Sequence, residues 1–302
     1  MKNREASYLK LPKANSLESK LGLARKHLTA CNLCPHECNV NRSKKLGVCR
    51  ASNKVVVSSY GPHFGEEAPL VGHRGSGTIF FGYCNMRCVF CQNCELSFGG
   101  EGETISNEKL ATIMLKLQDE YYCHNINLVT PTHFVVNILE ALKLAVEGGL
   151  RLPLVYNCGG YEGIETLKLL DGVIDIYMPD FKYNLDERGI KYSKVKKYPQ
   201  MVKKALIEMD QQVGGLKLDE QGIAYRGLLI RHLMMPGGLE DTKEILAFIA
   251  QKLSSECMVN LMDQYFPEHQ AFEFEEIGTR LSPRDYKEAV KFAGDLGLRL
   301  AY

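Results

Sequence analysis

Cys84-Asn85-Met86-Arg87-Cys88-Val89-Phe90-Cys91 follows closely on the apolar run Thr78-Ile79-Phe80-Phe81. At this cysteine content, the spacing C-x3-C-x2-C arises by chance in such a chain on the order of once in a hundred times. Thiolates are the usual ligands of iron-sulfur clusters, and a cubane of four irons normally takes four of them. Three cysteines leave one iron open to chelate the amino and carboxylate groups of a methionine moiety.

From this stretch onward, short apolar runs alternate with segments whose apolar residues recur at helical spacing. The expected strands are at 78–81, 126–129, 154–156, 173–177, 228–230 and 258–261. We expect helices after them: one capped by Ser106, one opened by Thr130-Pro131, and others at about 163–170, 198–212, 240–253 and 283–294. Strands that alternate with helices imply a parallel sheet, either doubly wound or curved into a barrel.

Residues with chemical side chains fall at or just beyond the ends of the expected strands. These residues are Cys84, Thr130, Asn157, Asp180, Arg231 and Gln264. Both kinds of parallel sheet place ligand-binding residues at the carboxyl ends of their strands. We therefore expect one site there, with Arg231 and Gln264 either contacting a cofactor or substrate or simply solvated.

The composition argues against several classes of partner. The 302-residue chain has 37 Lys and Arg against 36 Asp and Glu, so no excess charge favours nucleic acid or acidic lipid. The polar start, Met1-Lys2-Asn3-Arg4-Glu5, and the absence of a long apolar run predict a cytoplasmic protein without membrane spans. Eleven cysteines in such a protein should be reduced, which favours metal binding.

The motif at 84–91, with an aromatic residue before its last cysteine, resembles that of the radical S-adenosylmethionine superfamily. More narrowly, the chain resembles uncharacterised homologues of pyruvate formate-lyase activating enzyme over the segments 75–81, 91–93, 127–133 and 177–182. This resemblance implies a partial, TIM-like barrel of six β/α units. It also implies an oxidoreductase that binds S-adenosylmethionine across the open top and generates a 5′-deoxyadenosyl radical.

The resemblance implies roles for residues around the cofactor. Phe90 should pack near the adenine, although a core position would also explain it. Relatives usually carry Gly-Gly-Glu after the second strand, whereas this chain has Thr130-Pro131-Thr132-His133. The hydroxyls of Thr130 and Thr132 are candidates for the missing hydrogen bonds to the methionine amino group, and helix capping is the alternative for Thr130.

Asp180 and Lys182 match an Asp-x-Lys motif of the glycyl-radical activating enzymes. By this resemblance, Asp180 helps to hold a monovalent cation beside the methionine carboxylate, and Asn157 or Cys158 contributes to the same site. A plain ion pair between Asp180 and Lys182 is the alternative.

Four further cysteines precede the barrel as Cys31-x2-Cys34-x3-Cys38-x10-Cys49. Zinc and iron both fit a four-thiolate shell, so the set is either a closed structural metal site, which we favour, or a second 4Fe-4S cluster. We expect residues 1–60 to form an amino-terminal segment with this module, and residues 61–302 to form the barrel. The segment 63–67 either lines the substrate mouth or is ordinary surface.

Three functions remain open. The resemblance to activating enzymes favours an enzyme that takes a hydrogen atom from a glycine of a partner protein. Its electron donor would be a protein such as flavodoxin or ferredoxin. The departure from Gly-Gly-Glu and the extra cysteines keep open a radical enzyme that acts on a small molecule or another peptide. A zinc-binding interaction protein, with Cys94 as a fourth ligand beside Cys91, is the alternative from another class.

Overall fold

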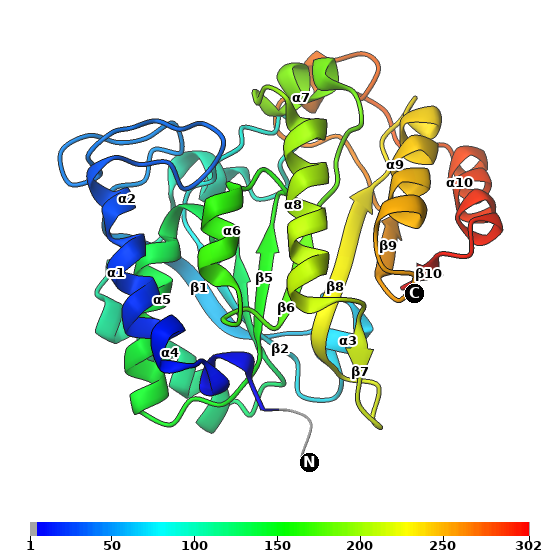
Figure 1. The fold of residues 1–302 in the computed structure, drawn as a ribbon. Helices are drawn as coiled ribbons and strands as arrows, with labels where there is room; N and C mark the ends of the chain where they lie inside the picture. Colours follow the sequence, from blue (N-terminus) through cyan, green and yellow to red (C-terminus); the bar gives the residue numbers. More distant parts are fainter. Residues whose placement is uncertain (1–4, 302) are drawn as a thin grey trace.

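Ten strands form the central sheet in a computed structural model that describes residues 5–301 (Figure 1). They are β1 (Val55–His63), β2 (Ser76–Phe81), β3 (Glu103–Ile105), β4 (Ile126–Val129), β5 (Leu154–Cys158), β6 (Ile176–Pro179), β7 (Lys217–Leu218), β8 (Ala224–Leu233), β9 (Met258–Met262) and β10 (Arg299–Leu300). The spatial order is β10-β9-β8-β6-β5-β4-β2-β1-β3, and β7 pairs only with β8.

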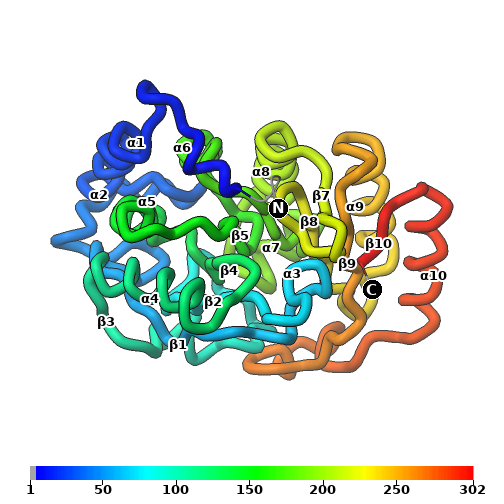
Figure 2. The backbone as a smooth tube through the Cα atoms, turned by 90° about the horizontal axis from the view of Figure 1, so that it is seen from below, coloured from blue at the N-terminus to red at the C-terminus, as the bar shows by residue number. Residues whose placement is uncertain are grey.

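The strands from β2 to β10 along this order run parallel, which confirms the predicted parallel sheet. The six predicted strands correspond to β2, β4, β5, β6, β8 and β9, although β6 begins later than its apolar run. The curved sheet ends at β3 and β10, so the barrel is partial (Figure 2). Sequence patterns did not reveal β1 and β3, which extend the sheet antiparallel, or the short β10.

Ten α-helices accompany the sheet within the described residues. They are α1 (Leu17–Ala24), α2 (Lys26–Thr29), α3 (Ala68–Val71), α4 (Asn107–Asp119), α5 (Val135–Glu147), α6 (Ile164–Leu170), α7 (Asp186–Ser193), α8 (Tyr198–Val213), α9 (Leu239–Lys252) and α10 (Pro283–Asp295). The predicted cap of α4 is confirmed, since Ser106 Oγ accepts a hydrogen bond from the Lys109 N–H at 3.2 Å.

The predicted start of α5 at Thr130-Pro131 is wrong. Thr130 has a φ of 60°, and its N–H donates to the Asn157 carbonyl at 2.8 Å. Thr130 therefore continues the pairing of β4 with β5 by one residue. A single 3-10 turn over Thr132–Phe134 follows, and α5 begins at Val135. Thr130 therefore belongs to the strand end and does not cap the helix.

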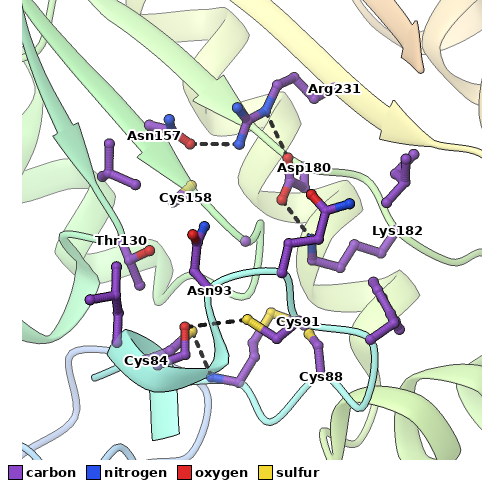
Figure 3. A pocket seen from close by; sticks show the side chains of 18 of the residues that line it. Cys84, Cys88, Cys91, Asn93, Thr130, Asn157, Cys158, Asp180, Lys182 and Arg231 are labelled. Atoms are coloured by element: carbon purple, nitrogen blue, oxygen red, sulfur yellow. Dashed lines mark hydrogen bonds and ion pairs between the residues drawn. The ribbon is translucent and has the colours of Figure 1, made fainter. Parts of the chain in front are cut away.

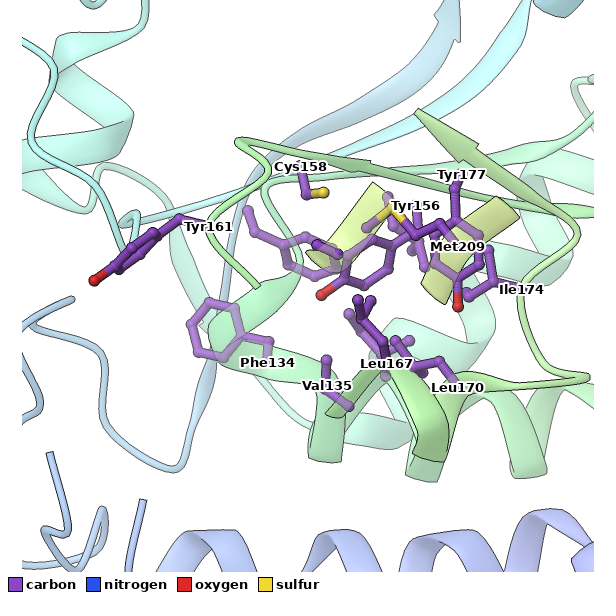
Figure 4. Close-up of a cluster of buried hydrophobic side chains, with 14 of the residues drawn as sticks. Phe134, Val135, Tyr156, Cys158, Tyr161, Leu167, Leu170, Ile174, Tyr177 and Met209 are labelled. Carbon is purple, nitrogen blue, oxygen red and sulfur yellow. The ribbon is translucent and has the colours of Figure 1, made fainter. Parts of the chain in front are cut away.

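A layer of aromatic side chains fixes the middle of the sheet against its helices (Figure 4). Tyr156 of β5 and Tyr177 of β6 are buried among side chains that include Leu167 of α6 and Met209 of α8. Each such ring buries roughly 150–250 Å², and the phenol oxygens are not left unpaired. Tyr156 donates to Glu162 at 3.0 Å and Tyr177 donates to Gln212 at 2.7 Å. The strand ends that follow are thus held on a rigid support.

The amino-terminal residues pack onto the barrel, since Leu21 and Ala24 of α1 belong to the same buried core as the sheet. α1 lies beside α5, and the loop after α2 lies toward the carboxyl ends of the parallel strands (Figure 1). Strand β1 crosses residue 60 and pairs with β2. The division at residue 60 stays a prediction. Among the described helices, none combines the length and the apolar character that a bilayer crossing requires.

Candidate active site

A cavity of about 280 Å³ lies at the carboxyl ends of the parallel strands (Figure 3). It gathers the residues predicted at the strand ends, namely Cys84, Thr130, Asn157, Asp180, Arg231 and Gln264, together with Cys88, Phe90, Cys91 and Lys182. Asn157 and Arg231 lie in the last residues of β5 and β8, and the other side chains come shortly after β2, β4, β6 and β9, because parallel strands present their carboxyl ends at one edge. The structure thus brings the predicted set together, with the exception of Thr132.

The residues 84–91, which we call the cysteine loop, form one wall of the cavity. Each of its three sulfurs has a polar neighbour: the Met86 N–H at 3.3 Å from Cys84 Sγ, Ser193 Oγ at 3.0 Å from Cys88 Sγ, and Ser97 Oγ at 3.4 Å from Cys91 Sγ. Hydrogen bonds of this kind stabilise thiolate ligands and tune the metal they hold. The donor set, three thiols with polar neighbours, is therefore of the chemical kind that holds a 4Fe-4S cluster.

Burial dominates the titration of two of these thiols. It raises the pKa of Cys84 well above its ordinary value, and it raises that of Cys88 to about 11, although the nearby Lys182 ammonium opposes the increase. Both would be protonated at neutral pH without a further positive charge. A metal centre would supply that charge, because metal binding deprotonates a coordinating thiol.

The opposite wall carries a network of charges around Asp180. Its Oδ1 accepts from Arg231 Nε at 2.9 Å, its Oδ2 accepts from Lys182 Nζ at 2.6 Å, and Arg231 Nη2 donates to Asn157 Oδ1 at 2.7 Å. Burial alone would raise the pKa of Asp180, but Arg231 and Lys182 outweigh it and hold the pKa below its usual range. The ion pair that the sequence left as an alternative is present, and Arg231 extends it.

Thr132 lies outside the cavity, so its predicted contact with the methionine amino group is not supported by its position. Its hydroxyl donates to Glu162 Oε1 at 2.8 Å, and it is buried. Burial raises the pKa of Glu162 to about 7, although hydrogen bonds from Thr132 and Tyr156 oppose the increase. Sequence reasoning missed Glu162 because no spacing pattern marks a single carboxylate after a strand.

Residues 31–49, which we call the amino-terminal cysteine segment, bring their cysteines near one another. Sγ atoms of Cys38 and Cys49 both lie beside Gly47, where a Cβ would approach them to 3.5 and 3.6 Å. Arg42, only 1% exposed, directs Nη1 at Cys31 Sγ at 3.5 Å. In residues 5–301, no group of three or more His, Cys, Asp or Glu side chains has an arrangement suited to a metal ion.

The amino-terminal cysteine segment rests directly on the active-site wall. His36 Nε2 hydrogen-bonds the Asn85 carbonyl at 2.8 Å, and Arg87 Nη2 donates to the Val48 carbonyl at 3.2 Å. At Gly163 a Cβ would come within 2.7 Å of the Leu33 carbonyl oxygen, so the close approach of the segment requires glycine there. The two cysteine groups, distant in sequence, therefore share one interface.

Three solved structures with a bound ligand, peptide or adduct are similar to part of this chain. The chain is similar to anSMEcpe with bound AdoMet and Cp18Cys peptide (TM-score 0.46, 12% identity, 71% of this chain and 56% of that one). It is also similar to Streptococcus suis SuiB bound to precursor peptide SuiA (0.48, 12%, 72% and 46%) and to TYW1 with a lysine-pyruvate adduct bound (0.44, 12%, 91% and 81%). The chain thus spans about half the length of anSMEcpe and SuiB.

No protein-family model matches the chain. Its sequence is 34% identical over 311 residues to the uncharacterized protein MJ0674 of Methanocaldococcus jannaschii. The match covers 99% of this chain and 85% of that protein. The chain therefore belongs to the same protein family as MJ0674.

Proposed function

We propose that this chain is a radical S-adenosylmethionine enzyme whose Cys84, Cys88 and Cys91 hold a 4Fe-4S cluster. The observation that carries the proposal is the cavity wall, where these three half-buried cysteines face a network of charges at the carboxyl ends of six strands. A closed metal site would need no such cavity, whereas an open iron needs room for a ligand. The motif resemblance supports the same function.

The side chains around the cavity suit S-adenosylmethionine. Cys84, Cys88 and Cys91 would hold the cluster, which would supply the electron for cleavage of a carbon-sulfur bond of S-adenosylmethionine to methionine and a 5′-deoxyadenosyl radical. Phe90 offers its ring to the adenine. Lys182 and Arg231, which are both paired with Asp180, present positive charge toward the methionine carboxylate, and a monovalent cation beside Asp180 stays part of the proposal.

The finer reaction is proposed from the sequence resemblance. The leading candidate is an activating enzyme that abstracts hydrogen from a glycine of a partner protein, with a flavodoxin or ferredoxin as electron donor. A radical reaction on a small molecule or on another peptide is the second candidate, favoured by the replacement of Gly-Gly-Glu at Thr130-Pro131-Thr132.

The cysteines at 31, 34, 38 and 49 are proposed to hold a second metal, either zinc or iron. Arg42 supports this proposal, because the described residues give its buried guanidinium contacts with Cys31 and two carbonyls but no carboxylate ion pair. A buried cation requires a compensating anion, and thiolates bound to a metal provide it.

The proposal is tested by purifying the protein without oxygen and adding S-adenosylmethionine with dithionite. We expect a brown protein with a broad absorption band near ~400 nm, acid-labile sulfide, and the release of methionine and 5′-deoxyadenosine. A protein that contains zinc in both cysteine groups and no sulfide would contradict the proposal and favour an interaction protein.

Replacement of Lys182 by methionine should weaken S-adenosylmethionine binding by about tenfold, or about 1.4 kcal/mol, because the methionine carboxylate loses a cation that lines the cavity. Equilibrium dialysis with labelled cofactor measures the affinity, and iron analysis checks that the cluster content is unchanged. Lys196→Met, at an exposed lysine nearby, is the control. Equal affinity in Lys182→Met and the wild type would remove Lys182 from the cofactor site.

A further inference from the structure

We propose that a second cavity, lined by Glu66, Glu67 and Asp263, binds a positively charged group of the substrate, either an alkylammonium or a guanidinium. The inference rests on the proposed radical function and names the class of substrate that the same active site takes. The second cavity encloses about 680 Å³ and shares Arg231, Met262 and Gln264 with the first. A substrate held in it lies beside the cofactor cavity.

Glu67 provides the first argument. Its side chain is about nine-tenths buried, and its Oε1 accepts a hydrogen bond from Asn260 Nδ2 at 2.9 Å. Its Oε2 is buried without any hydrogen-bond partner. An unpaired carboxylate oxygen in a buried position is costly, so a ligand with a charged N–H donor would gain affinity by completing it.

The balance of charge provides the second argument. Four carboxylates line the two cavities, from Asp180, Glu66, Glu67 and Asp263, against the cations of Lys182 and Arg231. Arg231 is engaged by Asp180 at 2.9 Å and lies 3.7 Å from Glu66. The described cations therefore leave an excess of negative charge.

The pKa of Glu66 is set chiefly by its burial. Burial raises its pKa, and Glu67 and Asp180 add to the increase, while Arg231 and the adjacent His63 oppose it. A cation bound beside Glu66 would favour its ionised form.

The apolar surfaces of the second cavity suit the stem of such a group. Leu261 and Met262 are the last residues of β9, and Phe64, 63% exposed, also lines the cavity. Long cationic side chains bury their methylene stems on apolar surface and stack their charged ends on aromatic rings. The cavity thus fits a side chain like that of lysine or arginine, carried on a peptide or as a free amine.

The test measures the binding of defined probes to the cluster-loaded protein with S-adenosylmethionine present. Four labelled heptapeptides have three glycines on each side of lysine, arginine, norleucine or glutamate, and n-butylamine serves as a competitor. We expect the lysine or arginine peptide to bind at least tenfold more tightly than the norleucine peptide. Competition by n-butylamine at concentrations comparable with the peptide's would indicate a free amine as the source, whereas weak competition would indicate a peptide.

Glu67→Gln keeps the acceptor for Asn260 and removes the charge, and Glu66→Gln/Glu67→Gln removes both charges. We expect the preference for cationic probes to fall about tenfold in the double variant and to persist in Glu275→Gln, an exposed control. Equal or absent binding of the lysine, arginine and norleucine peptides would overturn the inference. So would a loss of S-adenosylmethionine affinity in the double variant with an unchanged peptide preference, which would assign the carboxylates to the cofactor.

The release of 5′-deoxyadenosine is measured on the same samples. Cleavage without a preference for cationic probes overturns only the inference about the substrate. Absence of cleavage in the wild type with an intact cluster overturns the radical function itself.

Discussion

Cys88→Ala is expected to abolish the reductive cleavage of S-adenosylmethionine, lowering 5′-deoxyadenosine formation at least a hundredfold. Cys88 is the central cysteine of the loop and lies beside Ser193 Oγ and the charge of Lys182. Two remaining thiolates cannot hold a cubane that already has one iron without a protein ligand. Chromatographic measurement of 5′-deoxyadenosine, together with iron and sulfide analysis, tests this expectation.

Cys94→Ala is the matched control for this change. Cys94 is half-buried, follows the loop by three residues, and is not part of the cavity lining. Its replacement should leave the cleavage rate and the cluster content unchanged. Cleavage that survives in Cys88→Ala, or that is lost only in Cys94→Ala, would show that the ligands have been wrongly assigned.

Cys31→Ala is expected to lower the free energy of unfolding by about 3–5 kcal/mol, because it removes a metal ligand and leaves the buried guanidinium of Arg42 without its sulfur neighbour. Anaerobic urea unfolding measures the loss. Adding Arg42→Met to this variant should recover part of it, since the uncompensated charge is removed. Equal stability of Cys31→Ala and the wild type would argue against a metal in the amino-terminal cysteine segment.

The identity of the proposed second metal would decide what this segment does. If the metal is structural, its loss leaves the rate of S-adenosylmethionine cleavage per barrel cluster normal with either electron donor. A second cluster would give about eight rather than four irons per wild-type chain, and its loss would reduce cleavage with flavodoxin more than with dithionite. The ratio of the two rates in Cys31→Ala therefore separates a stabilising site from an electron relay.

Local patterns in the sequence were sufficient to predict the six parallel strands and the gathering of their end residues. The regular alternation of strand and helix determines which edge those residues share. The antiparallel β1 escaped prediction because it includes Gly61 and Pro62, which usually interrupt strands. Its pairing with β2 depends on contacts that no local pattern encodes.

The part of the site that depends on distant contacts could not be predicted. Glu67 meets Asn260 across 193 positions, and the sequence near Glu67 shows only adjacent carboxylates, which usually lie in solvent. The prediction for Thr132 was not supported for a different reason, which is local. Thr132 lies at the predicted strand end, but the turn that begins at Thr130 directs its hydroxyl to Glu162. The sequence patterns predicted the edge of the sheet at which these residues lie but not the orientation of each side chain.

The amino-terminal cysteine segment packs against residues that are synthesised after it. The segment ends at residue 49, yet it is held by Asn85 and by the close approach at Gly163. During synthesis the four cysteines therefore emerge well before β5 and its following turn exist to receive them. A metal ion bound at that stage would be held by a peptide that is not yet packed against the barrel. The alternative is that the ion binds only after β5 and its following turn have been synthesised. Loading of the proposed second metal would thus depend on the timing of translation as well as on supply.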